Sequence, residues 1–554
     1  MACAGNCRSW CRGDRLSLRR ATALGRNAAA PYCGGHRRRD AGAMSAPAPS
    51  CFASAPPPTN VYRPLMRASL APFLALGVAL ASCSAPSSED AAQVALIGGS
   101  LRIADPTTDR LDDGDRLLLP ALSQGLVGYD SDGKIEQGLA EAWTVTNDGL
   151  SYIFRIGPAH WNDGREVTAK DVANILTRRI AKASRNRLSG EVFAIESIRA
   201  MTDNVIEIRL GQPESDLLDL LAQPEFAIAS KRRGWGPMRA TAVGGHWLLS
   251  WAPERLGASA SEDDLPPVAL IDVAINAPDT ALARFGLGAA DAVLGGRYQD
   301  FPYVLASGID TKQLIIDPAH GLFGLAFVNE RGFFAASQNR SAIAKAIDRD
   351  AIVGAFGIEG WQPQLALRPS YADTPPVIAP VLPLWSDSPM ANRRIEARRT
   401  VAAWRAAGGA PVTVRIALPD GAGSRILFAS IEADLAAIGL VAKRVALFAD
   451  ADLRLIDQVA PSDNPLWLAH RLSCDGDVIC DAEIEAKIAR ADATADIVDR
   501  NALLAEIDAD LTGFVPYVPI ATPLRWALVA QRLDGYRGNI RARHSLAQLA
   551  PRPQ

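Results

Sequence analysis

Residues 150–180 read "LSYIFRIGPAHWNDGREVTAKDVANILTRRI", and this stretch contains in direct succession the signals for a strand, a tight turn and a capped helix. In its first seven residues Tyr152, Phe154 and Ile156 occupy every second position and so fall on one side, which is typical of a strand. Asp163 and Gly164 tolerate the positive φ angles of a tight turn, and Thr168 with Asp171 has the spacing of a capping box at a helix start. The helix then carries apolar residues on one face, at Val172, Ile175, Leu176 and Ile180. The turn and cap offer no evident nucleophile, general base or metal ligand, so we interpret them as scaffolding.

The length and charge of the chain limit the classes of protein it can belong to. With 554 residues, 48% of them hydrophobic, it can fold into two or more packed domains. The formal net charge is −3, and a nucleic-acid partner is not expected, because phosphate binding requires a clustered positive field.

The N-terminal 65 residues differ in composition from the rest. They are rich in Arg and Pro, contain no Lys and hold five of the eight cysteines. Since no hydrophobic periodicity organises them, we predict that residues 1–65 are disordered or are a mis-assigned upstream extension, and they are left out of the fold prediction.

Residues 66–83, "MRASLAPFLALGVALASC", look like an export signal. A short basic start precedes an apolar run that is too short to span a bilayer comfortably, and small residues follow it. The last four residues resemble a bacterial lipobox, which implies a signal peptide over 66–82, lipidation of Cys83 and a polar tether over 83–95. An ordinary buried helix that ends in a core cysteine is the alternative interpretation; an organelle transit peptide would not explain the lipobox.

Two cysteines remain downstream, Cys474 and Cys480 in "LSCDGDVIC". In an exported protein an isolated pair that closes a short loop is most simply a disulfide. Free thiols are a second possibility, and a metal site a third, although His470 is the only nearby candidate for a further ligand.

After residue 96 the chain alternates short strands and amphipathic helices, which is the pattern of an α/β protein. Clean strand patterns occur at 202–210, 268–276 and 411–419, and helical patterns become more frequent after Ala277. Because the loop-like segment "SASEDDLPP" precedes the strand at 268–276, we expect the crossover between two lobes near residues 268–280.

Motifs for catalysis are scarce. The sequence contains no G-x-S-x-G elbow, phosphate-binding P-loop or H-E-x-x-H pair, and its six histidines are scattered. We therefore predict no enzyme, no catalytic residues, no cofactor and no bound metal.

Five ordered motifs between residues 119 and 180 resemble those of the bacterial extracellular solute-binding proteins of the oligopeptide and dipeptide type, family five. The matching segments are Gly125–Val127, Leu139–Trp143, Asp148–Phe154, Trp161–Gly164 and Thr168–Val172. Looser similarity continues over nearly all of the exported chain.

The resemblance implies an α/β protein with the two-lobed periplasmic-binding-protein fold and a hinge between the lobes. We expect the first lobe at 96–272 with an inserted subdomain at about 128–215, the second lobe at 273–515 and a C-terminal return to the first lobe at 516–554. It further implies a monomeric, lipid-anchored periplasmic receptor that passes a peptide or other small solute to the permease subunits of an ABC importer.

The resemblance also suggests where a solute could bind. In family members that take peptides, an acidic residue of the second lobe meets the free amine of the ligand. The comparable region here offers Asp457 and Asp463, and the altered "GTGP" loop offers Trp235. Asp463 could instead start a turn, and Trp235 could pack against the cleft rather than line it. These departures leave open a non-peptide solute such as a metal chelate, an opine or a glycan, or a cell-wall peptide; an envelope hydrolase or a structural lipoprotein is a more distant alternative.

Overall fold

A computed structural model describes residues 91–161, 163–230, 233–252, 271–368, 378–533 and 535–550. The upstream segment, the predicted signal peptide, Cys83 and most of the predicted tether lie outside the described residues. The first strand begins at Ala92, before the predicted start of the first lobe. Within the described ranges, no helix has the length and apolar character that a membrane crossing requires.

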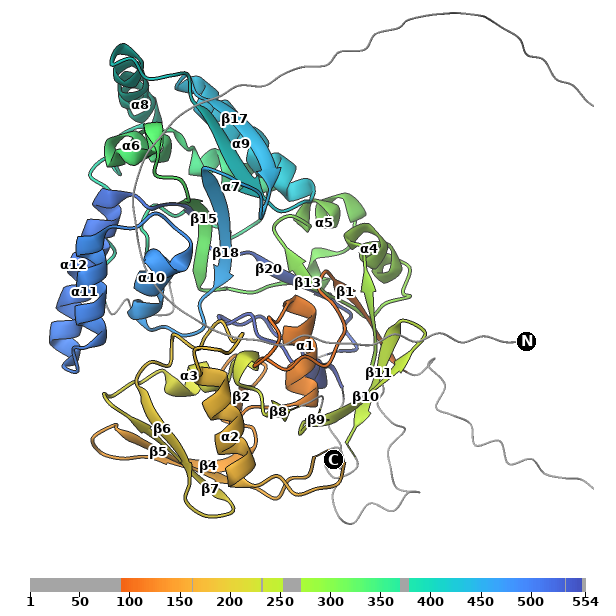
Figure 1. Ribbon diagram of the computed structural model, residues 1–554. Helices are drawn as coiled ribbons and strands as arrows, with labels where there is room; N and C mark the ends of the chain where they lie inside the picture. Colours follow the sequence, from red (N-terminus) through yellow and green to blue (C-terminus); the bar gives the residue numbers. More distant parts are fainter. Residues whose placement is uncertain are drawn as a thin grey trace, which may run out of the picture. The chain divides into compact units, whose positions relative to one another are not determined.

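The first central sheet has seven strands in the order β10-β11-β12-β1-β13-β20-β14. β1 pairs in parallel with β12 and β13, whereas β20 runs antiparallel to β13 and β14. Because β20 lies near the C-terminus, the end of the chain returns to the sheet that β1 begins (Figure 1). The strands span Ala92–Ile97 (β1), Met238–Val243 (β10), His246–Trp251 (β11), Ile271–Asn276 (β12), Ala292–Arg297 (β13), Leu314–Ile316 (β14) and Arg525–Val529 (β20).

Helices α1, α4 and α5 and the short helix η7 accompany this sheet. Helix α1 begins with a capping box formed by Asp112 and Asp115, and it contacts β10 and the short C-terminal helix η7. Helix α4 contacts β1 and β13, and α5 packs beside α4. The bounds are Asp113–Leu122 (α1), Pro278–Gly286 (α4), Phe301–Ser307 (α5) and Leu546–Leu549 (η7).

The opening stretch of sequence lies in a separate antiparallel sheet, ordered β4-β5-β7-β6, with helix α2 beside it. The predicted strand and capped helix are confirmed, since β5 buries Tyr152 and Phe154, and Thr168 and Asp171 form the capping box of α2. Gly164 has a φ of 81°, as the turn requires. The bounds are Ala140–Val145 (β4), Ser151–Ile156 (β5), Ala169–Ile180 (α2), Ile195–Ala200 (β6) and Val205–Leu210 (β7).

Short elements flank this four-stranded sheet in the sequence. β2 and β3 form a hairpin before it, and a short helix, a 3-10 turn and a two-stranded ribbon follow it. They span Val127–Tyr129 (β2), Ile135–Gln137 (β3), Leu217–Leu221 (α3), Pro224–Phe226 (η2), Ala229–Ser230 (β8) and Arg233–Gly234 (β9).

The second central sheet has five strands in the order β17-β16-β18-β15-β19. β16 is parallel to β17 and β18, whereas β15 is antiparallel to β18 and β19. The strands span Gly321–Phe327 (β15), Thr413–Leu418 (β16), Val441–Ala446 (β17), Leu453–Val459 (β18) and Tyr517–Ala521 (β19).

Helices of this second half pack around its sheet. α8 packs on α6, and Gly408 takes a left-handed φ of 85° just after the helix ends. The helices span Ser337–Ala346 (α6), Arg349–Phe356 (α7), Met390–Ala406 (α8), Ala422–Ala437 (α9), Pro465–Arg471 (α10), Ala482–Asp492 (α11) and Ile497–Phe514 (α12). Short 3-10 turns occur at Thr311–Gln313 (η4), Gly332–Ala335 (η5) and Cys474–Gly476 (η6).

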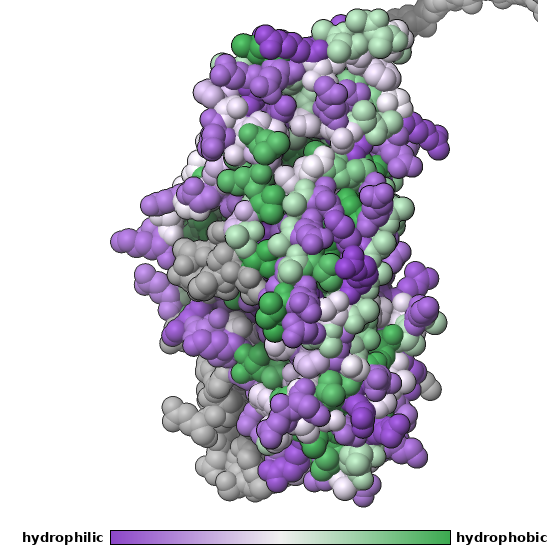
Figure 2. Space-filling view, turned by 90° about the vertical axis from the view of Figure 1, so that its left-hand side faces the viewer, coloured by the Kyte–Doolittle hydropathy of each residue, from purple (hydrophilic) through white to green (hydrophobic). Residues whose placement is uncertain are grey.

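Helices α10, α11 and α12 contact one another at one side of the second half. Figure 2 shows this side, on which hydrophobic residues occur in small groups among hydrophilic ones. The larger apolar side chains of these helices, such as Trp467, Ile488 and Leu511, are buried in a shared core. The helices are therefore held by the burial of apolar surface.

The crossover between the central sheets differs from the predicted position. β12, β13 and β14 all belong to the first sheet, and the chain enters the second sheet only at β15, after Ile316. The linker-like composition before residue 271 marks a loop, but it cannot indicate which sheet the next strand joins. β12 stays in the first sheet because it pairs with β1 in parallel register over six residues. The chain crosses back between β19 and β20, at residues 522–524.

Candidate functional site

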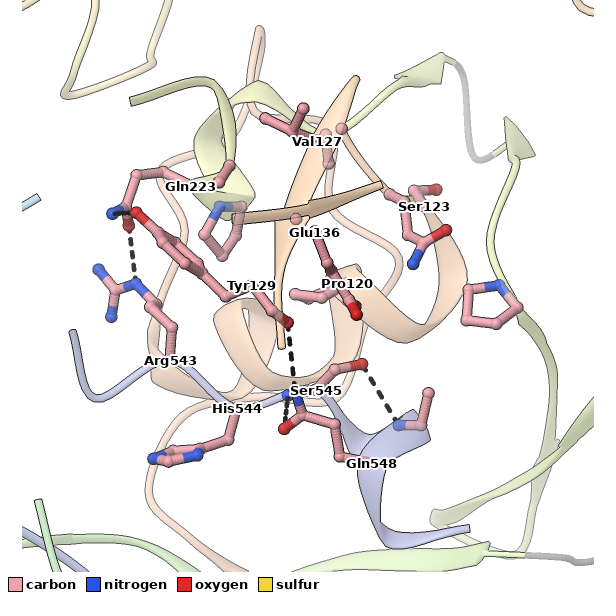
Figure 3. Close-up of a pocket in the computed structure, with 18 of the residues that line it drawn as sticks. Pro120, Ser123, Val127, Tyr129, Glu136, Gln223, Arg543, His544, Ser545 and Gln548 are labelled. Atoms are coloured by element: carbon pink, nitrogen blue, oxygen red, sulfur yellow. Dashed lines mark hydrogen bonds between the residues drawn. The ribbon is translucent and has the colours of Figure 1, made fainter. Parts of the chain in front are cut away.

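A cavity of about 320 Å³ lies between the C-terminal end of α1, the β2–β3 hairpin, residues 222–227 and the C-terminal segment 543–548 (Figure 3). Its volume is at the small end of the range for ligand pockets, roughly 300 to 1,000 Å³. The lining mixes apolar surface with convergent polar side chains, among them Ser123, Tyr129, Gln223 and Arg543. This combination is the usual character of a small-molecule site.

The first of the resembling motifs, Gly125–Val127, forms part of the cavity wall. A Cβ atom on Gly125 would lie 2.7 Å from the carbonyl oxygen of Leu221 and 2.9 Å from that of Val127. Glycine is therefore required there, because backbone segments meet more closely than any side chain allows.

Gln223 connects the polar groups of the cavity. Its Oε1 accepts a hydrogen bond from Nε of Arg543 at 2.8 Å, and its Nε2 donates to the hydroxyl of Tyr129 at 3.0 Å and to the carbonyl of Pro461 at 2.7 Å. The Tyr129 hydroxyl in turn donates to the carbonyl of Asp219 at 2.7 Å. Because Pro461 follows β18, Gln223 joins the cavity to the half of the chain built on the second sheet.

Arg116 and Arg543 carry the positive charges of the lining. Nε of Arg116 donates to a carboxylate oxygen of Glu225 at 2.9 Å, so its charge is balanced. The side chain of Arg543 is half-buried, and this burial lowers its pKa, although an arginine with a modestly lowered pKa stays charged at neutral pH.

Asp457, which the sequence suggests as a ligand contact, lies on β18 inside a ladder of ion pairs. Nη1 of Arg525 lies 2.7 Å from one carboxylate oxygen of Asp457, and Nη1 of Arg297 lies 3.4 Å from the other. Arg297 also pairs with Asp113, at the start of α1. Burial raises the pKa of Asp113, but the neighbouring Arg297 and Arg525 lower it more, to about 2. The ladder ties α1 and the first sheet to the second sheet.

Asp463, the other suggested acid, also has a cationic partner. Arg541 donates to its two carboxylate oxygens at 2.9 and 2.8 Å, and Nδ1 of His320 lies 3.2 Å away. Hydrogen bonds from His320 and Arg541 overcome the effect of burial and lower the pKa of Asp463. Any ammonium group of a ligand would have to compete with this bidentate pair, and the role of both acids in ligand binding stays a prediction.

Trp235 lies in a buried apolar cluster beside the four-stranded sheet and is 6% exposed. Its carbonyl accepts a hydrogen bond from the backbone N–H of Gln124 at 2.9 Å, so the loop supports the cavity wall through its backbone. The side chain is not among those that line the cavity, and Pro237 of the same loop is. A direct ligand contact by Trp235 stays a prediction.

Cys474 and Cys480 are joined in a disulfide in the structure, between α10 and α11. The carboxylate of Glu485 and the two sulfur atoms lie within 4.8 Å of one another. Because the sulfurs are bonded to each other, they are not thiolates that could bind a metal.

The C-terminal segment from Arg541 to Gln548 supplies site residues that the sequence prediction missed. His544 lies 3.0 Å from Asp317, and Gln548 donates to the carbonyl of Tyr129 at 3.2 Å. The segment "YRGNIRARH" could have been predicted as part of a polar site, because it has three arginines and a histidine close together after the last strand.

Comparison with known proteins identifies the family. Residues 134–451, more than half of the chain, match the bacterial extracellular solute-binding proteins, family 5 Middle. The chain therefore belongs to the bacterial extracellular solute-binding proteins, family 5.

Individual relatives are more distant. Over 162 residues the chain is 30% identical to the glutathione-binding protein GsiB of Escherichia coli O1:K1 / APEC. The aligned segment covers 28% of this chain and 31% of that protein. The chain thus spans about a third of the length of the curated relatives it matches.

Solved structures show the same two-lobed fold. Haemophilus influenzae OppA in complex with RPPGFSPFR has a TM-score of 0.69 at 18% identity, over 82% of this chain and 98% of that one. The Escherichia coli murein tripeptide binding protein MppA has a TM-score of 0.68 at 17% identity, over 83% of this chain and 97% of that one. The two central sheets are thus the cores of two lobes, and the predicted fold class is confirmed.

Proposed function

We propose that this protein is a receptor that captures a peptide or peptide-like solute between its two lobes and delivers it to an ABC importer. The observation that carries the proposal is the polar cavity of the first lobe, whose hub residue Gln223 reaches Pro461 of the second lobe. Membership of the solute-binding family supports it, and so do relatives described as binding glutathione, a nonapeptide and a murein tripeptide.

Contacts between the lobes provide the means of coupling binding to closure. Besides the bond between Gln223 and Pro461, Asn464 at the start of α10 donates to the carboxylates of Glu214 and Asp216 at 2.9 and 3.2 Å. A solute that touches both the cavity and these segments would bind the closed arrangement more tightly than an open one. Binding would then shift the population toward closure, which is the signal that an importer can read.

Attachment to the membrane through Cys83 is part of the proposal and rests on the lipobox alone. Replacing Cys83 with Ser should release the protein from the membrane fraction of its host. Retention of the variant in the membrane fraction would refute lipidation at this cysteine.

A thermal-shift screen against peptides tests the receptor function. The protein is purified from Cys83 onward and titrated with reduced glutathione and with pools of dipeptides, tripeptides and longer peptides. A ligand at one hundred times its Kd stabilises the folded protein by about 2.7 kcal/mol, so binding raises the melting temperature measurably. No shift with any peptide pool, together with a shift for a non-peptide solute, would move the assignment to another solute class. Chemical turnover of a bound compound would favour an enzyme instead.

A further inference from the structure

One helix of the second lobe, α10, meets the first lobe at both of its ends. Asn464, which caps the start of the helix, donates through Nδ2 to Glu214 at 2.9 Å and to Asp216 at 3.2 Å. In the last turn, Nδ1 of His470 lies 3.2 Å from the carboxylate of Glu191, and its ring packs edge-on against Phe193. The contact between the lobes on this side therefore depends on acidic side chains of the first lobe.

Glu214 and Asp216 form a buried pair of carboxyl groups. The two residues are 4% and 8% exposed, and a single amide, that of Asn464, donates to both. Oε2 of Glu214 and Oδ2 of Asp216 are buried and have no hydrogen-bond partner within the described ranges. Buried polar atoms are nearly always paired, and two ionised carboxylates that share a site repel each other. A proton on one carboxyl would let it donate to the other and would remove one of the two charges.

The charged and titratable groups around the pair leave this repulsion largely in place. Nη1 of Arg500 on α12 lies 3.9 Å from Oε2 of Glu214, which is too long for a hydrogen bond. The hydroxyl of Tyr152 on β5 donates to the backbone carbonyl of Glu214. Asp492 on α11 and Asp219 on α3 bring further negative charge near the pair. Retention of a proton by the pair therefore relieves a repulsion that its surroundings do not offset.

Other charged contacts between the lobes are not expected to change their charge near neutral pH. Burial is the largest of the causes that raise the pKa of Glu214, which reaches about 8. Burial lowers the pKa of His470, but hydrogen bonds with Asp492 and Glu191 raise it more, to about 10. Asp463 has a lowered pKa, because its hydrogen bonds outweigh the effect of burial. Of these three groups, only Glu214 can gain or lose a proton close to neutral pH.

We propose that Glu214 and Asp216 form a proton-dependent latch between the two lobes. While the pair holds one proton, Asn464 bridges it and the lobes stay together. When that proton is lost, two like charges remain in a buried contact, and opening of the contact to water relieves their repulsion. The latch rests on the lobe movement that the proposed function requires, but it does not depend on the identity of a solute.

Closing of the lobes takes up a proton, and opening releases it. In the open form the carboxyl groups meet water, where Glu214 has its ordinary pKa of 4.5. Between pH 4.5 and about 8 the closed form therefore holds one proton more than the open form. Each pH unit in this window should change the ratio of closed to open protein by about tenfold, and acid favours closure. A solute that binds only the closed form would bind more tightly in acid for the same reason.

The experiment follows opening in the purified full-length chain without any added solute. Hydrogen–deuterium exchange is measured by mass spectrometry from pH 5.5 to 9, and each rate is divided by the intrinsic amide rate at that pH. Protection of the two facing segments, 213–223 and 462–471, should fall by about tenfold per pH unit up to about pH 8. Protection of β1 should stay higher at every pH, because loss of the contact is a local opening and not unfolding of the lobe.

Three variants separate the latch from general effects of charge. Glu214→Gln should remove most of the pH dependence, because an amide does not titrate and can still donate to Asp216. Asp216→Asn should reduce it, because Glu214 then lacks the neighbouring like charge. Glu196→Gln is the matched control and should keep the native pH dependence, since Glu196 lies on β6 with 58% of its side chain exposed. If a latch variant fails to fold, the profile of the native chain still decides.

The outcomes distinguish the latch from the receptor function. Protection that does not change with pH in the native chain would refute the latch, and so would an equal pH dependence in the native chain and Glu214→Gln. Either result leaves the receptor function in place, because no solute takes part in the measurement. Failure of every peptide to bind in the thermal-shift screen would refute the receptor function for peptides and leave the latch in place.

Discussion

Replacing Glu214 with Gln should abolish a loss of stability that the native protein undergoes as the pH rises. Glu214 is 4% exposed and lies where the first lobe meets the second, with Asp216 beside it. Asn464 donates a hydrogen bond to each of these carboxylates, and Arg500 is 3.9 Å away. Burial raises the pKa of Glu214 to about 8; Asp216 and Asp492 add to the rise, and Arg500 opposes it.

The sign and size of the effect follow from this pKa. Between the ordinary value of 4.5 and about 8, the folded protein keeps a proton on Glu214 that the unfolded chain has released. The stabilisation is therefore complete below pH 4.5 and is lost as the pH rises to 8. One pKa unit corresponds to about 1.4 kcal/mol, so a rise from 4.5 to about 8 should lower the free energy of unfolding by on the order of 5 kcal/mol across this window.

The assay is the melting temperature of both proteins, measured at several pH values from 5 to 9. Glu214→Gln resembles the protonated form, so its profile should match the native one near pH 5 and lie above it near pH 9. Glu196→Gln is the control, because Glu196 lies on β6 with 58% of its side chain exposed. Parallel profiles for the native protein and Glu214→Gln would show that this carboxyl is not protonated at the lobe contact.

Two further substitutions and the reduction of the disulfide test the scaffold of the protein. Gly236→Ala should lower the free energy of unfolding by about 1 to 3 kcal/mol in chemical denaturation, since its Cβ would lie 2.3 Å from backbone of α1, whereas Gly190→Ala, with nothing within 4 Å, should change it little. Thr168→Ala should cost about 1 kcal/mol through loss of the cap of α2, and an unchanged denaturation midpoint would contradict that role. Reduction of the disulfide between Cys474 and Cys480 should cost about 2 kcal/mol, because the loop it closes is short; an equal melting temperature with and without reductant would contradict this.

The elements that could be predicted are those whose signals are local. The strand at Tyr152 and the helix after Thr168 depend on alternation, helical spacing and a cap that all lie within about thirty residues. The position of the lobe crossover depends instead on which sheet accepts β12. Residues 92–97 pair with residues 271–276, which are far away in the sequence. The composition of the linker before residue 271 does not predict this pairing.

The cavity also depends on contacts between distant parts of the chain, and these were not predicted from the sequence. Its walls come from residues near 125, near 223 and near 543, and no motif spans such separations. The resemblance to the family suggests acids of the second lobe as ligand contacts, because such an acid meets the amine of a peptide in other members. Charge pairing across the lobes, which only the folded chain reveals, decides whether such acids are available.

That pairing changes the recognition expected of this site. Asp457 and Asp463 each lie against an arginine, Arg525 and Arg541, so their negative charges are balanced before any solute arrives. Displacing either arginine would leave a buried cation without a partner, which opposes capture of an ammonium group at these positions. An ammonium group would therefore have to displace an arginine before it could bind either of these two acids.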